Sequence, residues 1–506
     1  MLNIDFQRIA LGLFMYATVS SCNDSFKSGR EGLLRRGACE ESLAQRLSDR
    51  ANIYCPGSQE FKNSTQRWST LEAPTFRATV EVATEGDVME VVKYANEHEL
   101  PFLAVNNAHG AITTVGQLQN GIMIWMRQLN SVKIAEDGQM ATFGGGVLDK
   151  AVTDALWAAG KQTVTGGCEC VSVIGPGLGG GHGLLQARHG LVSDQFVSLN
   201  MVMADGSLKT IDHASDLWFA VRGAGHNFGI VTSITSKIYN VQFPNWAFRN
   251  FTFTGDKLEA LYSNINEHVL QDDTQPVDLF HYSVILKNAA IDANNPIISF
   301  YILQEGVDIV EDAVVAPFLA LGPVSTFSGS GDYPALPSWI GWGNNAATCQ
   351  HAGLANTRFP IELQHYNITA QRSMYNLLSD TLNEIPALNR SVVLLEGYSQ
   401  QGVKAFSSKE SAYPFRGSNL LLAPVVRYIE EDEKLAKEGK DLGEALRDIL
   451  HVGSDRVTKR TYVNYAFGTE SFQEIYGDEF WRRKRLLALK KKYDPSGKFS
   501  FYAPIA

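Results

Sequence analysis

A glycine-rich segment, residues 164–190, constrains the fold of this chain more than any other stretch. Glycine loses more backbone freedom on folding than any other residue, so a run of glycines needs a local reason. The usual reason is that a flat or charged group approaches the main chain closely. Backbone N–H groups along such a loop can bind a phosphate. The segment therefore predicts a binding site rather than a simple connection.

Length, composition and charge set the class of protein. The chain has 506 residues, enough for two or three domains, and its 44% hydrophobic and 19% charged residues are ordinary for a globular protein. A formal net charge of −10 argues against a nucleic-acid partner, because neutralising phosphates needs a basic face. The basic run at 482–492 has Leu486 and Leu489 at helical spacing, which predicts a solvated helix face.

The N-terminus has the pattern of a secretory signal. Arg8 precedes an apolar stretch, residues 9–17, that is too short to span a bilayer, and small residues follow it. We therefore expect residues 1–21 to be a signal peptide, with a buried N-terminal helix as the alternative. The expectation is a secreted protein without a membrane anchor. Four N-glycosylation sequons fit this route: Asn63, Asn250, Asn367 and Asn389.

The cysteines suggest one local disulfide and no zinc site. Cys39 and Cys55 lie close in the sequence and are expected to be able to pair in an oxidising compartment. Cys168 and Cys170 share the glycine-rich segment, and no second closely spaced pair accompanies them, so structural zinc is not expected. Cys349 has no evident partner and is expected to be a small buried residue.

The pattern of predicted strands, helices and loops changes along the chain. A loop-rich segment, residues 22–65, precedes residues 66–241, in which short strands alternate with helices. Residues 242–454 differ in pattern, and residues 455–506 form a compact, aromatic-rich end. This order predicts an α+β fold with more than one domain.

Hydrophobic periodicity indicates the elements of residues 66–241. Short apolar runs predict strands at 77–82, 102–105, 121–126 and 140–143. Apolar residues at helical spacing predict helices at 87–99 and 147–159. Asp205-Gly206 predicts the turn of a hairpin over residues 196–211.

Residues 242–454 predict an antiparallel sheet backed by helices. Strands are expected at 247–253, 279–286 and 297–303. Helices are expected at 256–269 and 308–321. Proline and glycine concentrate at 322–345, which predicts a long surface loop.

Four further motifs accompany the glycine-rich segment in a fixed order. An expected strand is followed by the loop 106–110, and a glycine run lies at 144–146. The segments 223–230 and 462–465 follow. From Arg67 to the C-terminus, this order resembles the vanillyl-alcohol-oxidase / p-cresol-methylhydroxylase flavoproteins. Within them it is similar to the berberine-bridge-enzyme-like FAD-linked oxidoreductases, including those of fungal secondary metabolism.

The resemblance implies a two-part FAD-binding domain of the p-cresol-methylhydroxylase type, formed by residues 66–241 and 455–506. A substrate domain, residues 242–454, would be inserted between the two parts. It also implies an FAD joined to the protein by one or two covalent bonds. The residues implied to bind the cofactor are Asn106, Asn107, Ala108, His109, Gly110, Cys168, Gly175, Gly179, Gly180, Gly181, His182, Gly183, Gly229, Ile230 and Asn464.

Two of these residues are candidates for the covalent bonds. His109 takes the place of the family's flavin-linking histidine, although the arginine and both glycines that precede it in the family are absent here. Cys168 lies eleven residues before Gly179, the spacing of the family's second linking residue, whereas Cys170 has no match. A thioether, a free thiol and a disulfide are the alternatives for Cys168. His182 is expected near the pyrophosphate, and no histidine has the spacing of a metal ligand.

Hydride transfer to a flavin requires a base for the neighbouring O–H or N–H proton. The glutamate of berberine-bridge-type enzymes is replaced here by Pro424. Glu396, in an apolar strand that begins at Val392, is the next candidate, and burial would raise its pKa. An exposed strand end is the alternative. Tyr462 and Tyr465 match the family's Tyr-x-Asn-Tyr motif, and either a role as base or core packing is open for them.

The resemblance implies a secreted FAD-dependent oxidoreductase that removes a hydride from an alcohol, amine or C–H bond of a small metabolite. Dioxygen is the expected acceptor that reoxidises the flavin. An oxidative cyclase that closes a ring is one alternative, and a non-catalytic scaffold that retains the fold is another. No metal ion, nucleic acid or membrane partner is expected.

Overall fold

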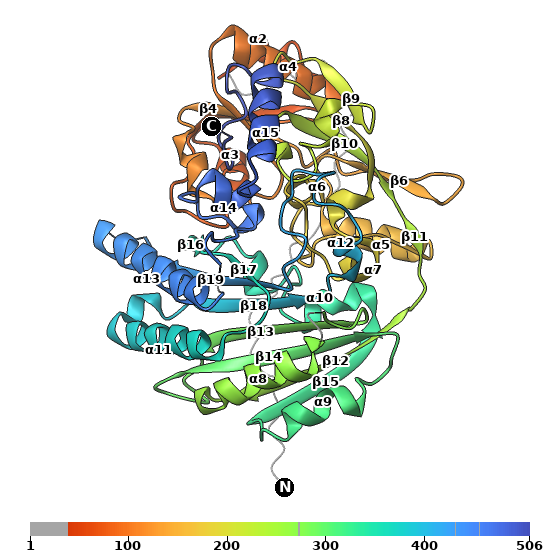
Figure 1. Ribbon diagram of the computed structural model, residues 1–506. Helices are drawn as coiled ribbons and strands as arrows, with labels where there is room; N and C mark the ends of the chain where they lie inside the picture. The colour runs from red at the N-terminus through yellow and green to blue at the C-terminus, as the bar shows by residue number, and fades with distance from the viewer. Residues whose placement is uncertain (1–38, 272–273, 431, 455, 506) are drawn as a thin grey trace, which may run out of the picture.

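The computed structural model describes residues 39–271, 274–430, 432–454 and 456–505. The expected signal peptide at 1–21 lies outside these residues. Figure 1 shows two layers, with the sheets of the N-terminal part above and one large sheet with its helices below. The C-terminal helix α15 (Phe480–Tyr493) returns to pack on the N-terminal part. No helix in the described ranges is long and apolar enough to cross a membrane.

The first sheet of the N-terminal part has the strand order β1-β2-β4-β3. β1 (Asn52–Tyr54) pairs antiparallel with β2 (Phe76–Glu81), while β4 (Gly121–Trp125) pairs parallel with β2 and with β3 (Phe102–Val105). Helix α4 (Glu85–Glu97) begins at a capping box and crosses between parallel strands. Its buried apolar residues follow the expected spacing: Val88, Val91, Val92 and Ala95.

A five-stranded antiparallel sheet in the order β5-β6-β10-β8-β9 follows. Its strands are β5 (Val132–Ile134), β6 (Met140–Gly144), β8 (Phe196–Val202), β9 (Leu208–Asp212) and β10 (Ile230–Lys237). Gly206 lies in the β8–β9 turn with φ +79°, a conformation that favours glycine, so the expected hairpin is confirmed.

Short elements complete the N-terminal part. Helix α5 (Asp149–Ala158) confirms the helix expected at 147–159. The glycine-rich segment contains the short helices α6 (Ile174–Leu178) and α7 (Gln186–His189). The remaining small elements are α2 (Glu41–Ala44), α3 (Gln59–Ser64), β7 (Lys161–Gln162) and β11 (Tyr239–Asn240).

The large sheet has the order β15-β12-β14-β13-β18-β19-β16, and β17 also pairs with β19. All its pairings are antiparallel. Its strands are β12 (Asn245–Phe253), β13 (Leu279–Lys287), β14 (Pro296–Glu305), β15 (Ser325–Asp332), β16 (Ala355–Arg358), β17 (Ile361–Leu363), β18 (Val392–Tyr398) and β19 (Leu420–Tyr428). The expected antiparallel sheet is therefore confirmed.

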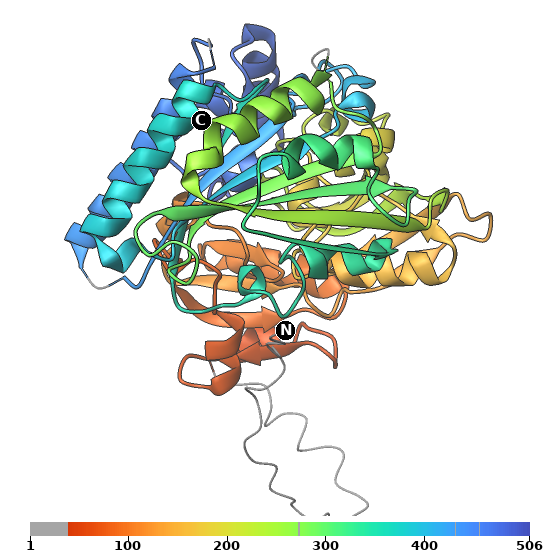
Figure 2. The ribbon, with the colours of Figure 1, turned by 90° about the horizontal axis from the view of Figure 1, so that it is seen from below.

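Helices cover one face of the large sheet, as Figure 2 shows. They are α8 (Leu258–His268), α9 (Asp312–Leu319), α11 (Ile368–Glu384) and α13 (Glu433–Val452). The shorter helices of this half are α10 (Leu336–Trp339), α12 (Gln401–Lys404) and α14 (Phe472–Tyr476).

Strand β18 shows how the two faces of the large sheet differ. Val393 and Leu395 pack into the core formed with the covering helices. Leu394 and Tyr398 pack into the core shared with the N-terminal part. Because side chains alternate along a strand, Glu396 shares the second face with Leu394 and Tyr398. The sheet thus presents this face, with Glu396 on it, to the N-terminal part.

The prediction of a long surface loop at 322–345 is wrong. Residues 325–332 form β15, which pairs with β12 along its whole length at the edge of the large sheet. Helix α10 follows within the same segment. Glycine and serine have low strand preference, but pairing with a neighbouring strand overrides such a preference.

The prediction that the basic run at 482–492 forms a solvated helix face is wrong at two positions. Arg482 is fully buried, and its guanidinium donates to the backbone oxygens of Ser408 and Ser411. Lys490 is buried and pairs with Asp494. These cations are therefore structural, because backbone oxygens and a carboxylate compensate for their burial.

Two disulfides occur in the described part of the chain. The Cys39–Cys55 bond confirms the local pairing. Cys170 pairs with Cys349, which lies 179 positions away, so the expectation that Cys349 is a lone buried residue is wrong. The sequence carried no local sign of this bond, because only the fold brings the two positions together. It joins the glycine-rich segment to the loop that follows α10.

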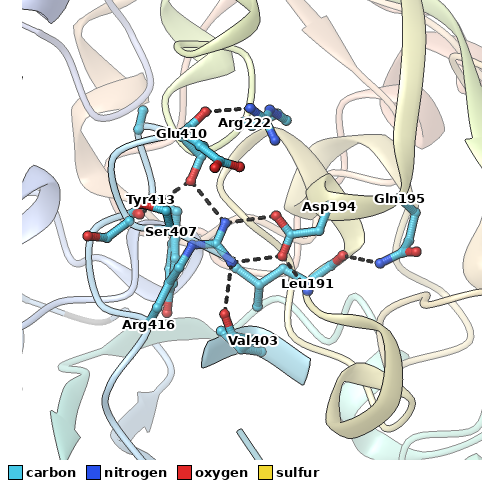
Figure 3. Close-up of polar contacts among 12 residues, drawn as sticks. Leu191, Asp194, Gln195, Arg222, Val403, Ser407, Glu410, Tyr413 and Arg416 are labelled. Atoms are coloured by element: carbon cyan, nitrogen blue, oxygen red, sulfur yellow. Dashed lines mark hydrogen bonds and ion pairs between the residues drawn. The ribbon is translucent and has the colours of Figure 1, made fainter. Parts of the chain in front are cut away.

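A buried ion pair makes a second connection between the two halves (Figure 3). Both guanidinium nitrogens of Arg416 donate to Asp194, at 2.8 Å each. Arg416 also donates to Ser411 Oγ and to the backbone oxygen of Val403. The Asp194 carboxylate accepts from the backbone N–H of Leu191. A bidentate pair with these additional partners compensates for the burial of both charges.

Removing the long-range disulfide is expected to destabilise the fold more than removing the local one. The loop-entropy relation gives about 5 kcal/mol for a loop the size of that between Cys170 and Cys349, and about 3 kcal/mol for the Cys39–Cys55 loop. We expect the double variant Cys170→Ser/Cys349→Ser to have the lower free energy of unfolding in denaturant titrations. The matched control is Cys39→Ser/Cys55→Ser. Equal losses would show that loop size does not govern the effect.

Candidate active site

A cavity of about 250 Å³ lies between the N-terminal part and the large sheet. The loops 103–110 and 166–176 form one side of it, and strands β16 and β18 contribute to the other. A second cavity of about 170 Å³ shares part of this wall, including Asn106, Gly175 and Tyr502. The two cavities therefore adjoin each other, and both contact the glycine-rich segment.

The loop after β3 lines the first cavity, and its first residue, Asn106, also lines the second. The Asn106 side chain donates to the backbone oxygen of Val147, and the Asn107 side chain donates to that of Cys170. Ala108 has φ +50°, in the left-handed region that glycine adopts more readily. Such a conformation costs roughly 1–3 kcal/mol and persists only where the surroundings enforce it. The loop therefore keeps a glycine-like backbone path although alanine occupies the position.

His109 lies in this loop and lines the cavity. Its ring stacks on Trp68, with the ring centroids 4.7 Å apart, and its Nε2 lies 2.9 Å from the backbone oxygen of Thr348. Burial, together with the charge of Arg358, lowers the pKa of His109 to about 3. The imidazole is thus neutral, and because a carbonyl oxygen can only accept, Nε2 carries the proton. Nδ1 is the ring nitrogen left without a proton.

Cys168 lines the same cavity as a free, half-buried thiol. Burial raises its pKa to about 12, so the sulfur is protonated. A turn, with the Val171 N–H donating to the Cys168 oxygen, separates it from Cys170, which is in the disulfide. The structure therefore distinguishes the two cysteines, and it excludes a disulfide for Cys168.

The glycines implied to bind the cofactor fall into two groups. Gly110 and Gly175 line the first cavity, and Gly229 with Ile230 lines the second. The remaining four glycines line neither cavity: Gly179, Gly180, Gly181 and Gly183. A Cβ at these positions would collide with other protein groups, including Asn464, Tyr413, Val192 and Thr165. This second group permits close packing of the chain on itself.

His182 lines the cavity but is held by protein partners. Its Nδ1 lies 2.9 Å from Gln186 Oε1, and its Nε2 lies 3.0 Å from Tyr413 Oη. Its ring also stacks on Tyr398. Burial lowers the pKa of His182 to about 4, so it is neutral. No cluster of three His, Cys, Asp or Glu side chains suited to a metal occurs among the described residues.

Glu396 is buried with only 1% of its surface exposed, so the exposed strand end considered for it is excluded. Its carboxylate accepts hydrogen bonds from Tyr398 at 2.7 Å and from Tyr465 at 3.0 Å. Burial raises its pKa, while the two phenols and Arg358 oppose the rise. The result is a carboxylate in an apolar site, fixed by two donors.

Tyr462 and Tyr465 both line the cavity and differ in their partners. Tyr465 donates to Glu396, whereas the Tyr462 oxygen accepts from Asn464 Nδ2 at 2.7 Å and from the His182 N–H at 3.2 Å. Burial raises the pKa of both phenols. They are therefore protonated, which supports roles as hydrogen-bond donors and packing groups rather than as phenolate bases.

The sequence reasoning missed several cavity residues. Tyr398 could have been predicted, because a residue two positions after Glu396 on the same strand lies on the same face as Glu396. No local pattern indicated the others: Arg67, Asp149, Trp342, Thr348 and Arg358. They come from segments far apart in the chain, and only the fold brings them to one wall.

Comparisons with known proteins agree with this arrangement. The family described as "FAD binding domain" matches residues 76–212, and the one described as "Berberine and berberine like" matches residues 461–506. The FAD-linked oxidoreductase chyH of Penicillium rubens is 48% identical over 97% of this chain and 98% of its own length.

Two solved structures share the fold. The BBE-like 1 protein of Physcomitrella patens has a TM-score of 0.78 and 19% identity, covering 93% of this chain and 100% of its own. A chitooligosaccharide oxidase has a TM-score of 0.76 and 20% identity, covering 93% and 99%. The fold is thus the α+β fold of the p-cresol-methylhydroxylase type. The chain belongs to the berberine-bridge-enzyme-like FAD-linked oxidoreductases.

Proposed function

We propose that the protein is a secreted oxidase with covalently bound FAD, which removes a hydride from an alcohol, amine or C–H bond of a small metabolite and passes the electrons to dioxygen. The observation that carries the proposal is the position of Glu396 in one cavity with His109 and Cys168. A buried carboxylate thus shares a space with the two residues suited to holding the cofactor. The oxidase name of the chitooligosaccharide enzyme supports dioxygen as acceptor.

The described residues fit an FAD. The two cavities adjoin, and their linings include a neutral histidine, a free thiol and several glycines. His226, at the wall shared by both, has a buried Nδ1 without a hydrogen-bond partner, which a cofactor atom would satisfy. Residues 66–241 and 455–506 would hold the cofactor, with residues 242–454 as the substrate domain.

The FAD, when bound, supplies the hydride acceptor. Glu396 would take the proton from the substrate O–H or N–H as the hydride leaves the neighbouring carbon. Tyr398 and Tyr465 orient the Glu396 carboxylate, and their hydrogen bonds oppose the rise in its pKa that burial causes, which favours the ionised form needed in a base. Because Glu396 and both phenols are buried, these interactions are stronger than they would be in water. An oxidative cyclase would use the same first step, and this alternative stays a prediction.

The proposal of secretion rests on the N-terminal pattern and on the two disulfides, which persist in oxidising compartments. The four sequons differ in the fold. Asn63, Asn367 and Asn389 are exposed. Asn250 lies in β12, and its Nδ2 donates to Ser299 and Phe300. That nitrogen, which a glycan would occupy, is therefore already used in the sheet.

Secretion is tested by expressing the chain in a eukaryotic secretory host. We expect loss of roughly the first 20 residues, with glycan found at Asn63, Asn367 or Asn389 and absent from Asn250. Mass spectrometry of the N-terminus and of deglycosylated peptides measures both. An intact Met1 in unglycosylated intracellular protein would contradict the proposal.

Covalent attachment is tested by acid precipitation. The wild-type pellet should retain flavin, and peptide mapping should place it on Nδ1 of His109 and on Cys168. Each single variant, His109→Ala or Cys168→Ala, should retain flavin through the remaining bond, and the double variant should release it. His189→Ala is the control, because that ring stacks on Tyr239 and does not line the cavity. Complete release from the wild type would end this claim.

The role of Glu396 is tested by Glu396→Gln. The substitution keeps the shape but removes the base, so kcat/KM should fall about 10²- to 10⁴-fold while flavin content stays the same. Tyr465→Phe removes a donor that lowers the pKa of Glu396, so the acidic limb of the pH–rate profile should move to higher pH. Glu305→Gln, a buried glutamate of the same sheet outside the cavity lining, is the control. Unchanged turnover in Glu396→Gln would refute the assignment.

A further inference from the structure

Arg358 is a buried cation without an ionic partner in the described chain. It ends β16, is 6% exposed, and lines the first cavity. Its guanidinium makes no ion pair or hydrogen bond among the described residues, and its Nε is buried without a partner. An unpaired buried charge is costly, so a fold that keeps one needs a compensating group.

Aromatic rings compensate for only part of this cost. The Arg358 guanidinium lies 4.4 Å from the centroid of Trp68 and 4.4 Å from that of Tyr465. Cation–π contacts of this kind contribute up to about 2 kcal/mol when desolvated. They bind the faces of the guanidinium and leave its N–H groups free. Those N–H groups form a planar fork that matches a carboxylate.

The charge of Arg358 acts at the centre of the cavity. It perturbs the pKa values of five lining groups: His109, Cys168, Glu396, Tyr465 and Tyr502. The only one of these that can be anionic near neutral pH is Glu396, and it lies beyond ion-pair distance from Arg358. Glu396 instead accepts from its two phenols. Tyr465 contacts both groups, because its ring lies 4.4 Å from the Arg358 guanidinium and its hydroxyl donates to Glu396.

The excess positive charge extends beyond Arg358. Arg67 also lines the cavity and makes one described hydrogen bond, to the backbone oxygen of Gly110. Arg427 lies behind Trp68, and its Nε is buried without a partner. Burial lowers the pKa of both to about 10, and no described carboxylate pairs with either. This wall of the cavity is thus suited to an anion.

The flavin would not supply that anion. Under the proposed function, His109 and Cys168 hold the benzenoid end of the ring system, which carries no charge. The Arg358 guanidinium and the His109 ring both contact Trp68, so Arg358 lies near that end. The cavity lining also carries several flat aromatic side chains, including Trp342, Tyr398 and Tyr465. The missing partner is consequently sought in the substrate.

We propose that the substrate is a flat aromatic molecule that carries a carboxylate, and that Arg358 binds this carboxylate and directs the oxidisable group toward Glu396. The inference rests on the proposed function and names the substrate class of the same site. Arg358 is a specificity-determining residue in this account, and it takes no part in moving the proton or the hydride.

The test compares benzoate with benzamide, a neutral molecule of the same shape. Each is titrated into the purified holoenzyme while the flavin absorbance spectrum is followed. We expect benzoate to bind at least 10-fold more tightly than benzamide. Arg358→Met should weaken the binding of benzoate about 10- to 100-fold, as expected for a charged hydrogen-bonded contact, and leave the binding of benzamide nearly unchanged. Arg358→Lys keeps the charge but lacks the planar fork of N–H groups, so its affinity for benzoate should lie between those of the wild type and Arg358→Met.

Arg427→Met is the matched control, because it removes a neighbouring guanidinium that does not line the cavity. It should weaken the binding of benzoate less than Arg358→Met does. Equal binding of benzoate and benzamide by the wild type would overturn the inference, and so would a benzoate preference that survives in Arg358→Met. If Arg358→Met does not fold, the wild-type comparison together with Arg358→Lys decides.

A failure of the proposed function gives a different result. Purified protein without flavin absorbance would contradict the oxidase proposal. Binding of benzoate and benzamide would then be measured by the shift in Tm, so the carboxylate preference is still tested. A flavin-containing protein that oxidises other substrates but shows no carboxylate preference would contradict this inference alone.

Discussion

The buried ion pair between Arg416 and Asp194 fixes the large sheet against the N-terminal part. Taking two charges out of water is costly, and the pair is favourable only with good geometry and further hydrogen bonds. The bidentate contact, Ser411, Val403 and Leu191 supply them. Three residues before Arg416, Tyr413 packs over Gly180 and meets His182. The position of the cavity wall thus depends on this pair.

Burial sets the protonation of most ionisable groups that line the cavity. It keeps His109 and His182 neutral and Cys168 protonated. It also raises the pKa of Glu396 and of the two phenols that contact it, so these phenols are protonated. In such a medium, an interaction between charges is much stronger than in water. Reactivity at this site is therefore set by a few placed groups rather than by solvent.

Local patterns in the sequence were enough for much of the fold and for part of the site. Hairpin β8–β9, helix α4 and the alternation around Glu396 all follow from short-range periodicity and turn chemistry. Strand β15, the Cys170–Cys349 bond and Arg358 do not, because each depends on a partner distant in the chain. The motif glycines do not all line the cavities: Gly179 and Gly183 pack against protein, and spacing alone cannot distinguish that role from ligand binding.

The bond between Cys170 and Cys349 also constrains how the molecule is made. The two cysteines are separated by 179 positions in the sequence, and β12 to β15 of the large sheet lie between them. The ribosome therefore completes the glycine-rich segment well before Cys349 emerges, so Cys170 cannot form its native bond until then. During that interval the neighbouring Cys168 is available as a competing partner. Correct pairing is thus an outcome of the order of synthesis and folding.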